Sequence, residues 1–200
     1  MRWIAVVWAL ALLHAAPAKE APVTYRVRLE TTKGPIVMAV HRGWAPNGAD
    51  RFHELVKSGY YDGARFFRIR KGTWVQFGIA GDPKVAQAWR TKTIQDDPYV
   101  GVSNTRGTVA FAFKDPNGRT TQVFINLKDN SETHDKEPFA VFATVEKGIE
   151  AADALYAEYG EAAGGGIRAG RQDPVFEGGN AYLQANFPLL DYIKKAEIVR

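Results

Sequence analysis

The chain has 200 residues, a formal net charge of +4 and no cysteine. This length suggests a single domain, and the lack of cysteine excludes disulfides, thiol catalysis and a lipid-anchoring cysteine. Basic residues are interspersed with acidic ones and form no continuous run, so we expect no nucleic-acid partner.

The first 18 residues have the pattern of a secretory signal peptide. A basic start, Met1-Arg2, precedes an apolar run from Trp3 to Leu13, and Ala16-Pro17-Ala18 then offers small residues for cleavage. A membrane anchor is the alternative, but the run is much shorter than the ~20 residues of a spanning helix. We expect a signal peptide over residues 1–18, a short leader over 19–24, a domain over 25–200, and export to the periplasm or beyond without a membrane anchor.

The domain begins with a predicted hairpin followed by a helix. Residues 24–30 and 36–40 read as two strands around a turn containing Gly34-Pro35. Pro46 suits a first helical turn, because its missing N–H would be unpaired there, and Gly59 is typical of a helix end. Apolar residues at helical spacing lie between them.

Residues 61–78 alternate like a pair of strands around a Lys71-Gly72 turn. If the turn keeps the register, Arg68, Trp74 and Gln76 share one face of the sheet. A cation, an amide and an indole on one face suit a polar peptide group beside an apolar ring. The alternative is that Arg68 is an ordinary solvated residue of an amphipathic strand.

Residues 79–106 lack periodicity, with a turn predicted at Gly81-Asp82-Pro83, and their length suggests an ordered surface loop with a functional role. Further strands are expected over residues 107–113, 121–126, 138–145 and 191–199, a helix over 150–159 and a short helical turn over 181–187. Gly164-Gly165-Gly166 reads as a flexible loop. The whole pattern predicts a mostly β fold, a closed antiparallel β-barrel capped by two α-helices.

Several kinds of site can be set aside. The chain has no G-x-S-x-G, G-x-x-x-x-G-K-[ST] or H-E-x-x-H motif. Residues 129–135 contain carboxylates and His134 and could bind a divalent cation, but they lack the spacing of a calcium loop. A solvated turn is the favoured interpretation.

Four segments, in order, resemble the cyclophilin-type peptidyl-prolyl cis-trans isomerases. They are residues 61–78, the strand-turn-strand block of residues 104–126, Phe139-Ala140-Val141-Phe142, and a tail from Gly160 to Ile193 that resembles an exported bacterial subgroup. The resemblance covers about residues 25–199 and implies a cyclophilin-like barrel.

The resemblance also implies roles for particular residues. Arg68 falls on the catalytic arginine of the family, and no cofactor is implied. The positions that match substrate-binding residues are Gln76, Trp74, Ala112, Gln122, Phe124 and Phe139. The chain departs from the family pattern at Phe67, Arg70, Thr73, Trp74 and Phe113, and neither Thr133 nor His134 is assigned a role.

The expected function is therefore peptidyl-prolyl cis-trans isomerisation in exported proteins during folding. Expected ligands are proline-containing peptides, unfolded or folding proteins, and cyclosporin-like inhibitors. One alternative is a non-catalytic proline-peptide binding module or holdase chaperone on the same fold, which the departures at Phe67, Thr73 and Phe113 keep open. A small-ligand β-barrel is another, but its wide lumen conflicts with the many bulky aromatic residues.

Overall fold

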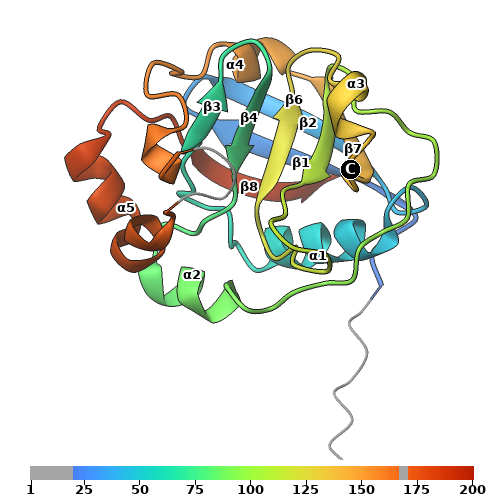
Figure 1. Cartoon of the computed structure of the whole chain (residues 1–200), viewed down its shortest axis with the longest axis horizontal. Helices are drawn as coiled ribbons and strands as arrows, with labels where there is room; N and C mark the ends of the chain where they lie inside the picture. The colour runs from blue at the N-terminus through green and yellow to red at the C-terminus, as the bar shows by residue number, and fades with distance from the viewer. Residues whose placement is uncertain (1–19, 167–170) are drawn as a thin grey trace, which may run out of the picture.

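The computed structural model describes residues 20–166 and 171–200, and Figure 1 shows their arrangement. The expected signal peptide, residues 1–18, lies outside the described residues. The expected leader is tied to the domain at Ala21, which is 7% exposed and whose backbone N–H donates to Asp50 Oδ1 at 2.9 Å.

Eight antiparallel strands form one curled sheet in the order β3-β4-β6-β5-β7-β2-β1-β8. The strands are β1 (Thr24–Thr31), β2 (Gly34–His41), β3 (Arg68–Arg70), β4 (Trp74–Phe77), β5 (Thr108–Phe111), β6 (Val123–Asn126), β7 (Val141–Lys147) and β8 (Ile193–Val199).

The two end strands of this sheet approach each other through the segment before β3. Phe66 N–H donates to Asp191 O at 3.0 Å, Ile193 N–H donates to Ala64 O at 2.9 Å, and Arg65 forms a bridge with Tyr192. The mostly β antiparallel barrel predicted from the sequence is confirmed, with its last seam closed by a few backbone bonds.

The barrel interior is filled by side chains. Leu29, Ile36, Met38 and Ile125 have no exposed surface, so the core leaves no lumen of the kind a small-ligand barrel needs. Helix α1 (Pro46–Lys57) covers one end of the barrel, where Phe52 lies 5.1 Å from Phe142, measured between ring centroids (Figure 1).

The other helices differ from the sequence prediction. The helix predicted over residues 150–159 is shorter in the structure, where α4 spans Ile149–Asp153. A short helix α3 (Ser131–His134) follows β6, and a 3₁₀ turn η1 (Ala162–Gly164) follows α4. None of the helices in the described part of the chain combines the length and apolar character needed to cross a membrane.

Helix α2 (Pro83–Trp89) lies where a turn and loop were expected. Asp82 caps it by accepting from Lys84 N–H at 2.8 Å, and Pro83 occupies its first turn. The Asp-Pro pair is common to turns and to helix starts, so local sequence does not separate the two.

Helix α5 (Asp173–Asn186) is much longer than the predicted turn over residues 181–187. The glycines within it reduce helix propensity, and Gly179 has non-helical angles (φ 52°, ψ −142°) that kink it. A Cβ on Gly179 would lie 2.3 Å from Gly81 O, so this glycine lets α5 pack against the start of α2. The two helices pack against each other at one side of the barrel (Figure 1).

Candidate active site

The register of three neighbouring strands aligns the central residues of the site. Arg68 on β3 is directly opposite Gln76 on β4, and Gln76 is directly opposite Phe124 on β6. Directly opposite residues project from the same face of a sheet, and Trp74 joins them because it is two residues from Gln76. The predicted shared face of Arg68, Trp74 and Gln76 is therefore present.

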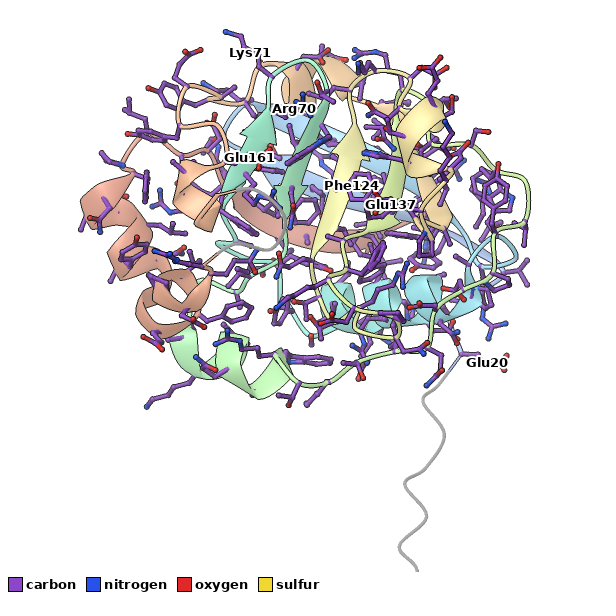
Figure 2. All side chains as sticks on the ribbon, in the orientation of Figure 1. Glu20, Arg70, Lys71, Phe124, Glu137 and Glu161 are labelled. Carbon is purple, nitrogen blue, oxygen red and sulfur yellow. The ribbon has the colours of Figure 1, made fainter. Side chains whose placement is uncertain are left out.

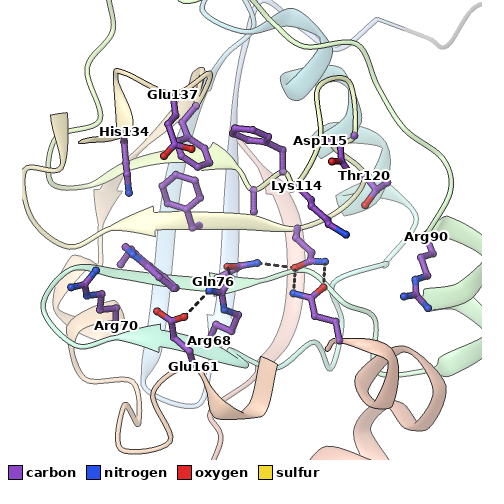
Figure 3. Close-up of a pocket in the computed structure, with 18 of the residues that line it drawn as sticks. Arg68, Arg70, Gln76, Arg90, Lys114, Asp115, Thr120, His134, Glu137 and Glu161 are labelled. Atoms are coloured by element: carbon purple, nitrogen blue, oxygen red, sulfur yellow. Dashed lines mark hydrogen bonds and ion pairs between the residues drawn. The ribbon is translucent and has the colours of Figure 1, made fainter. Parts of the chain in front are cut away.

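A pocket of about 730 Å³ opens on this outer face of the barrel (Figure 3). Its lining includes all seven residues that were predicted for the site: Arg68, Trp74, Gln76, Ala112, Gln122, Phe124 and Phe139. The structure thus brings the predicted residues together, whereas Thr73 and Phe67 are not among the lining residues. Phe67 is instead buried at 1% exposure.

One half of the pocket is an aromatic cup. Phe124 lies 5.2 Å from Phe139 and 5.3 Å from His134, and Phe113 lies 4.8 Å from Phe139, all measured between ring centroids. These are edge-to-face and tilted arrangements, which are favourable for ring pairs. The cup presents aromatic surface, which suits a small apolar ring such as a prolyl side chain.

His134 is a wall of this cup that sequence reasoning left unassigned. Burial lowers its pKa below the usual value of 6.5, although the carboxylates of Glu137 and Asp135 partly oppose this. The imidazole is therefore neutral at pH 7, and it can pack against aromatic rings without bringing a charge into the cup.

The other half of the pocket is a row of hydrogen-bonded polar side chains (Figure 3). Arg68 donates from Nη1 to Gln76 Oε1 at 2.9 Å and from Nη2 to Glu161 Oε2 at 2.8 Å. Gln76 Nε2 donates to Gln122 Oε1 at 2.7 Å, and Gln122 Nε2 donates to Gln172 Oε1 at 2.9 Å. The row runs from the segment after α4, across β3, β4 and β6, to the start of α5.

The arginine determines the direction of every amide in this row. Because a guanidinium only donates, Gln76 must turn its oxygen toward Arg68 and its NH₂ toward Gln122. Gln122 must then turn its oxygen toward Gln76. Within the described part of the chain, one N–H of Gln76 Nε2, one N–H on each terminal nitrogen of Arg68 and the Nε–H of Arg68 have no hydrogen-bond partner.

Arg68 is also held from its face. Its Cζ lies 5.2 Å from the ring centroid of Trp74, in a cation–π arrangement. Its side chain is only 8% exposed, so the cation is largely removed from water and its remaining donors act in a shielded environment. Trp74 thus contributes to the site by supporting the arginine as well as by lining the pocket.

Glu161 and Gln172 are site residues that sequence reasoning missed. They are 93 residues from Arg68 and 50 residues from Gln122 in the chain, and both belong to the stretch between α4 and β8. No local pattern marks either residue as part of a site, so only the folded arrangement identifies them.

The expected flexible loop at residues 164–166 was misinterpreted in part. A Cβ on Gly164 would lie 2.1 Å from Arg68 Cγ, so this glycine packs directly against the arginine stem. Two carboxylates of residues 129–135 have structural roles: Asp135 Oδ1 accepts from the Asn104 N–H and Nδ2 at 2.9 Å each, and Asp129 Oδ1 accepts from Ser131 N–H at 2.9 Å. Among the described residues, no group of three or more His, Asp or Glu could hold a metal ion.

Comparisons with known proteins agree with this geometry. The family model for cyclophilin type peptidyl-prolyl cis-trans isomerases matches residues 26–166. The chain is 35% identical over 156 residues to peptidyl-prolyl cis-trans isomerase A of Dickeya dadantii, covering 76% of this chain and 81% of that protein. It is 30% identical over 136 residues to peptidyl-prolyl cis-trans isomerase B of Escherichia coli, covering 64% and 82%.

Among solved structures, the fold is similar to a cyclophilin type peptidyl-prolyl cis-trans isomerase of Cryptosporidium parvum. The TM-score is 0.62 at 20% identity, with 88% of this chain and 98% of that chain covered. A second structure of that protein, solved in the presence of the dipeptide Ala-Pro, gives a TM-score of 0.61 at 21% identity, covering 88% and 99%.

Proposed function

The chain belongs to the cyclophilin family of peptidyl-prolyl cis-trans isomerases, and we propose that Arg68 is the residue that accelerates its reaction. The observation that carries this assignment is that Arg68 lines the pocket beside the aromatic cup, held there by hydrogen bonds to Gln76 and Glu161. The activity of its relatives favours an enzyme over the non-catalytic binding module or holdase.

The reaction requires no nucleophile. Resonance gives the C–N bond of a peptide partial double-bond character, and rotation about it faces a barrier of ~18–20 kcal/mol. When the X-Pro bond twists, the prolyl nitrogen becomes pyramidal and gains a lone pair that can accept a hydrogen bond. A donor that bonds this lone pair stabilises only the twisted state and so lowers the barrier.

Arg68 meets the requirements for this donor. Its guanidinium is a planar, rigid group that only donates hydrogen bonds. Gln76 is the candidate for the carbonyl of the residue before proline, because one of its Nε2 hydrogens is left free by the row. Trp74, Ala112, Phe124 and Phe139 would hold the prolyl ring, and Gln122 would keep Gln76 in place.

Arg68→Lys and Arg68→Ala test this assignment. Alanine leaves the Glu161 carboxylate and the Gln76 oxygen without their donor, so it should also lower Tm. Lysine keeps a cation for Glu161 but cannot reproduce the planar fork. We expect both variants to lose about a hundredfold to a thousandfold in kcat, equivalent to ~3–4 kcal/mol, with little change in peptide affinity.

Turnover is measured by NMR exchange or protease-coupled kinetics on one proline tetrapeptide, and peptide affinity by titration. Wild-type turnover in Arg68→Lys, with the fold intact by circular dichroism, would reject Arg68 as the catalytic donor. A wild-type chain that binds the peptide without accelerating its exchange would instead identify the binding module.

The ligands we propose for this pocket are proline-containing segments of unfolded or folding proteins. The Cryptosporidium relative was solved in the presence of Ala-Pro, and the aromatic cup here has matching chemistry. Cyclosporin-like inhibitors are proposed for the same pocket. Displacement of a labelled proline peptide by a cyclosporin tests this, and unchanged peptide binding at saturating inhibitor would contradict it.

Export of the protein to the periplasm or beyond is part of the proposal. Its support is the sequence of residues 1–18, with an apolar run followed by Ala16-Pro17-Ala18. N-terminal sequencing of the protein recovered from cell fractions should find a chain that starts near Lys19 outside the cytoplasm. A chain that keeps Met1 and fractionates with the cytoplasm would contradict export.

A further inference from the structure

We infer that Glu161 is a positioning residue for the isomerase reaction, acting through Arg68. This inference rests on the proposed role of Arg68. Glu161 Oε2 accepts from Arg68 Nη2 at 2.8 Å, and the two side chains are 20% and 8% exposed, respectively. Glu161 comes from the stretch after α4, so it reaches Arg68 from outside the sheet (Figures 2 and 3).

The backbone around Glu161 is fixed against the strand that carries Arg68. Ile69 N–H donates to Gly160 O at 2.9 Å, which ties the residue before Glu161 to β3. Gly164 N–H and Gly166 N–H both donate to Glu161 O, at 3.1 and 3.0 Å, and close a tight turn. The carboxylate is therefore presented from an anchored segment and not from a free loop.

The same turn supports the arginine stem from a second direction. Gly164 approaches Arg68 so closely that a Cβ there would lie 2.1 Å from Arg68 Cγ and 2.4 Å from Cδ. The stem is thus confined by the Gly164 backbone, while the guanidinium is confined by Glu161. Both contacts come from one short stretch, which indicates that this stretch sets the conformation of the arginine.

Glu161 is needed because the strands provide a hydrogen-bond acceptor for only one terminal nitrogen of the Arg68 guanidinium. Within β3 and β4, Gln76 accepts from Nη1, and Trp74 lies against the face of the group. These two contacts hinder rotation of the guanidinium about its Nε–Cζ bond but leave Nη2 without an acceptor. A second acceptor at Nη2 stops this rotation and supplies the countercharge that a buried cation requires. The donors that remain are then aimed at the prolyl nitrogen before substrate binds.

The chain contains a matched control three residues earlier. Glu158 pairs with Lys71 at 2.9 Å, but both side chains are exposed, at 64% and 79%. Exposed pairs of this kind contribute little to stability. Glu158→Gln therefore removes a carboxylate from the same segment and breaks an ion pair of similar length. It does not change any of the hydrogen-bonded side chains that line the pocket.

The experiment compares Glu161→Ala, Glu161→Gln and Glu158→Gln with the wild type, with kcat and KM determined separately on one proline peptide. We expect Glu161→Ala to lose about tenfold to a hundredfold in kcat, the scale of a misplaced catalytic group, with KM nearly unchanged. Glu161→Gln should recover most of this loss because its side-chain oxygen can accept the same hydrogen bond. Glu158→Gln should match the wild type.

A spectroscopic measurement separates positioning from general loosening. In the wild type, the Nη nitrogens of Arg68 should give distinct ¹⁵N signals, because Glu161 and Gln76 hinder rotation of the group. In Glu161→Ala these signals should average while the backbone spectrum shows a retained fold, although Tm should fall because the buried cation loses its countercharge. Equal averaging in both proteins would overturn the inference.

Failure of this inference is distinguishable from failure of the proposed role of Arg68. If Arg68→Lys abolishes turnover but Glu161→Ala retains wild-type kcat, only the role of Glu161 is rejected. If Glu161→Ala lowers kcat equally when added to Arg68→Lys, it acts elsewhere than through the arginine, and the inference is again rejected. If Arg68→Lys keeps full turnover, both assignments fall together.

Discussion

At the scale of single residues, the pocket joins two kinds of surface that meet at Arg68. On one side are aromatic rings, and on the other is a row of side chains joined by hydrogen bonds. Hydrogen bonds donated by a largely buried arginine are stronger than those of an arginine in water, because little solvent competes for them. This combination suits a reaction in which only a transient lone pair is recognised.

Phe124 should contribute mainly to peptide affinity. It is only 5% exposed and forms the centre of the cup between Phe139 and His134. Phe124→Ala would remove ring contacts worth about 1–3 kcal/mol of peptide binding, and its burial means that Tm should fall as well. Titration of a proline peptide into each protein measures the affinity. Phe124→Leu, which keeps apolar volume, is the control for folding, and wild-type affinity in a folded Phe124→Ala would place the prolyl ring elsewhere.

His134 should make stability depend on pH. Burial holds its folded pKa below the unfolded value of about 6.5, and Nδ1 is buried without a hydrogen-bond partner among the described residues. The unfolded chain therefore binds the proton more readily, so this contribution to stability is present above about pH 6.5 and is lost as pH falls toward the folded pKa.

The check is urea unfolding of the wild type and His134→Phe at about pH 7 and about pH 5. The difference in free energy of unfolding between the two pH values should be smaller in His134→Phe, because phenylalanine does not titrate. The other histidines are common to both proteins and cancel in this comparison. An equal pH dependence in the two proteins would contradict a half-buried, neutral His134.

At the scale of elements, the strands form one side of the pocket, and residues from the stretch between α4 and β8 form another. This stretch supplies Glu161 at one end of the polar row and Gln172 at the other, and α5 packs against α2 beyond them. The strands therefore carry Arg68 and Gln76, and the stretch between α4 and β8 supplies the hydrogen-bond partners at the two ends of the row.

Helix α1 is capped by a residue from the long loop that precedes β5. Its own N-cap position, Ala45, makes no side-chain cap, but Asp97 accepts from Asn47 N–H at 2.9 Å and from Gly48 N–H at 2.8 Å. Burial raises the pKa of Asp97, although these two hydrogen bonds oppose the shift. The loop is thus tied to the barrel through a helix cap.

Asp97→Ala should lower the free energy of unfolding by about 1–2 kcal/mol, the usual effect of removing an N-cap. Asp97→Asn keeps one acceptor oxygen and should lose less. Urea denaturation of the three proteins measures these differences. Equal stability of Asp97→Ala and the wild type would show that water replaces the carboxylate at the start of α1 without loss.

At the scale of the whole molecule, the barrel and its pocket are built from residues that follow the expected signal peptide. Glu20, at the start of the described chain, lies on the α1 side of the molecule, away from Arg70 and Glu161 at the pocket (Figure 2). Its carboxylate is 3.5 Å from the Arg42 guanidinium. The first contacts of the described chain therefore anchor the N-terminal end at a distance from the site.

A chain that begins at Lys19 should have the same Tm and kcat/KM as the full chain. A chain that begins at Thr24 is the matched control, because it lacks the hydrogen bond from Ala21 to Asp50 and should melt at a lower temperature. Differential scanning calorimetry and peptide exchange kinetics measure both properties. A large loss of stability on removal of residues 1–18 would contradict a cleaved signal peptide.

Local patterning identified most of the barrel and the shared face of Arg68, Trp74 and Gln76, whereas the other predicted site residues came from the family resemblance. The hairpin of β1 and β2, helix α1 and the facing of Arg68 and Gln76 all follow from alternation, turn residues and helical spacing, which act over a few residues. The family resemblance then assigned chemistry to these positions. Local signals failed at α2 and α5, where Asp-Pro and glycine pairs have more than one common conformation.

Tertiary structure alone decided which residues hold the arginine. The contact of Glu161 with Arg68 spans 93 residues, and that of Gln172 with Gln122 spans 50. Such pairs depend on how the segment between α4 and β8 docks on β3, and on the close approach that Gly164 allows. Periodicity carries no information about these contacts, because they arise from the packing of distant segments and not from the conformation of either one.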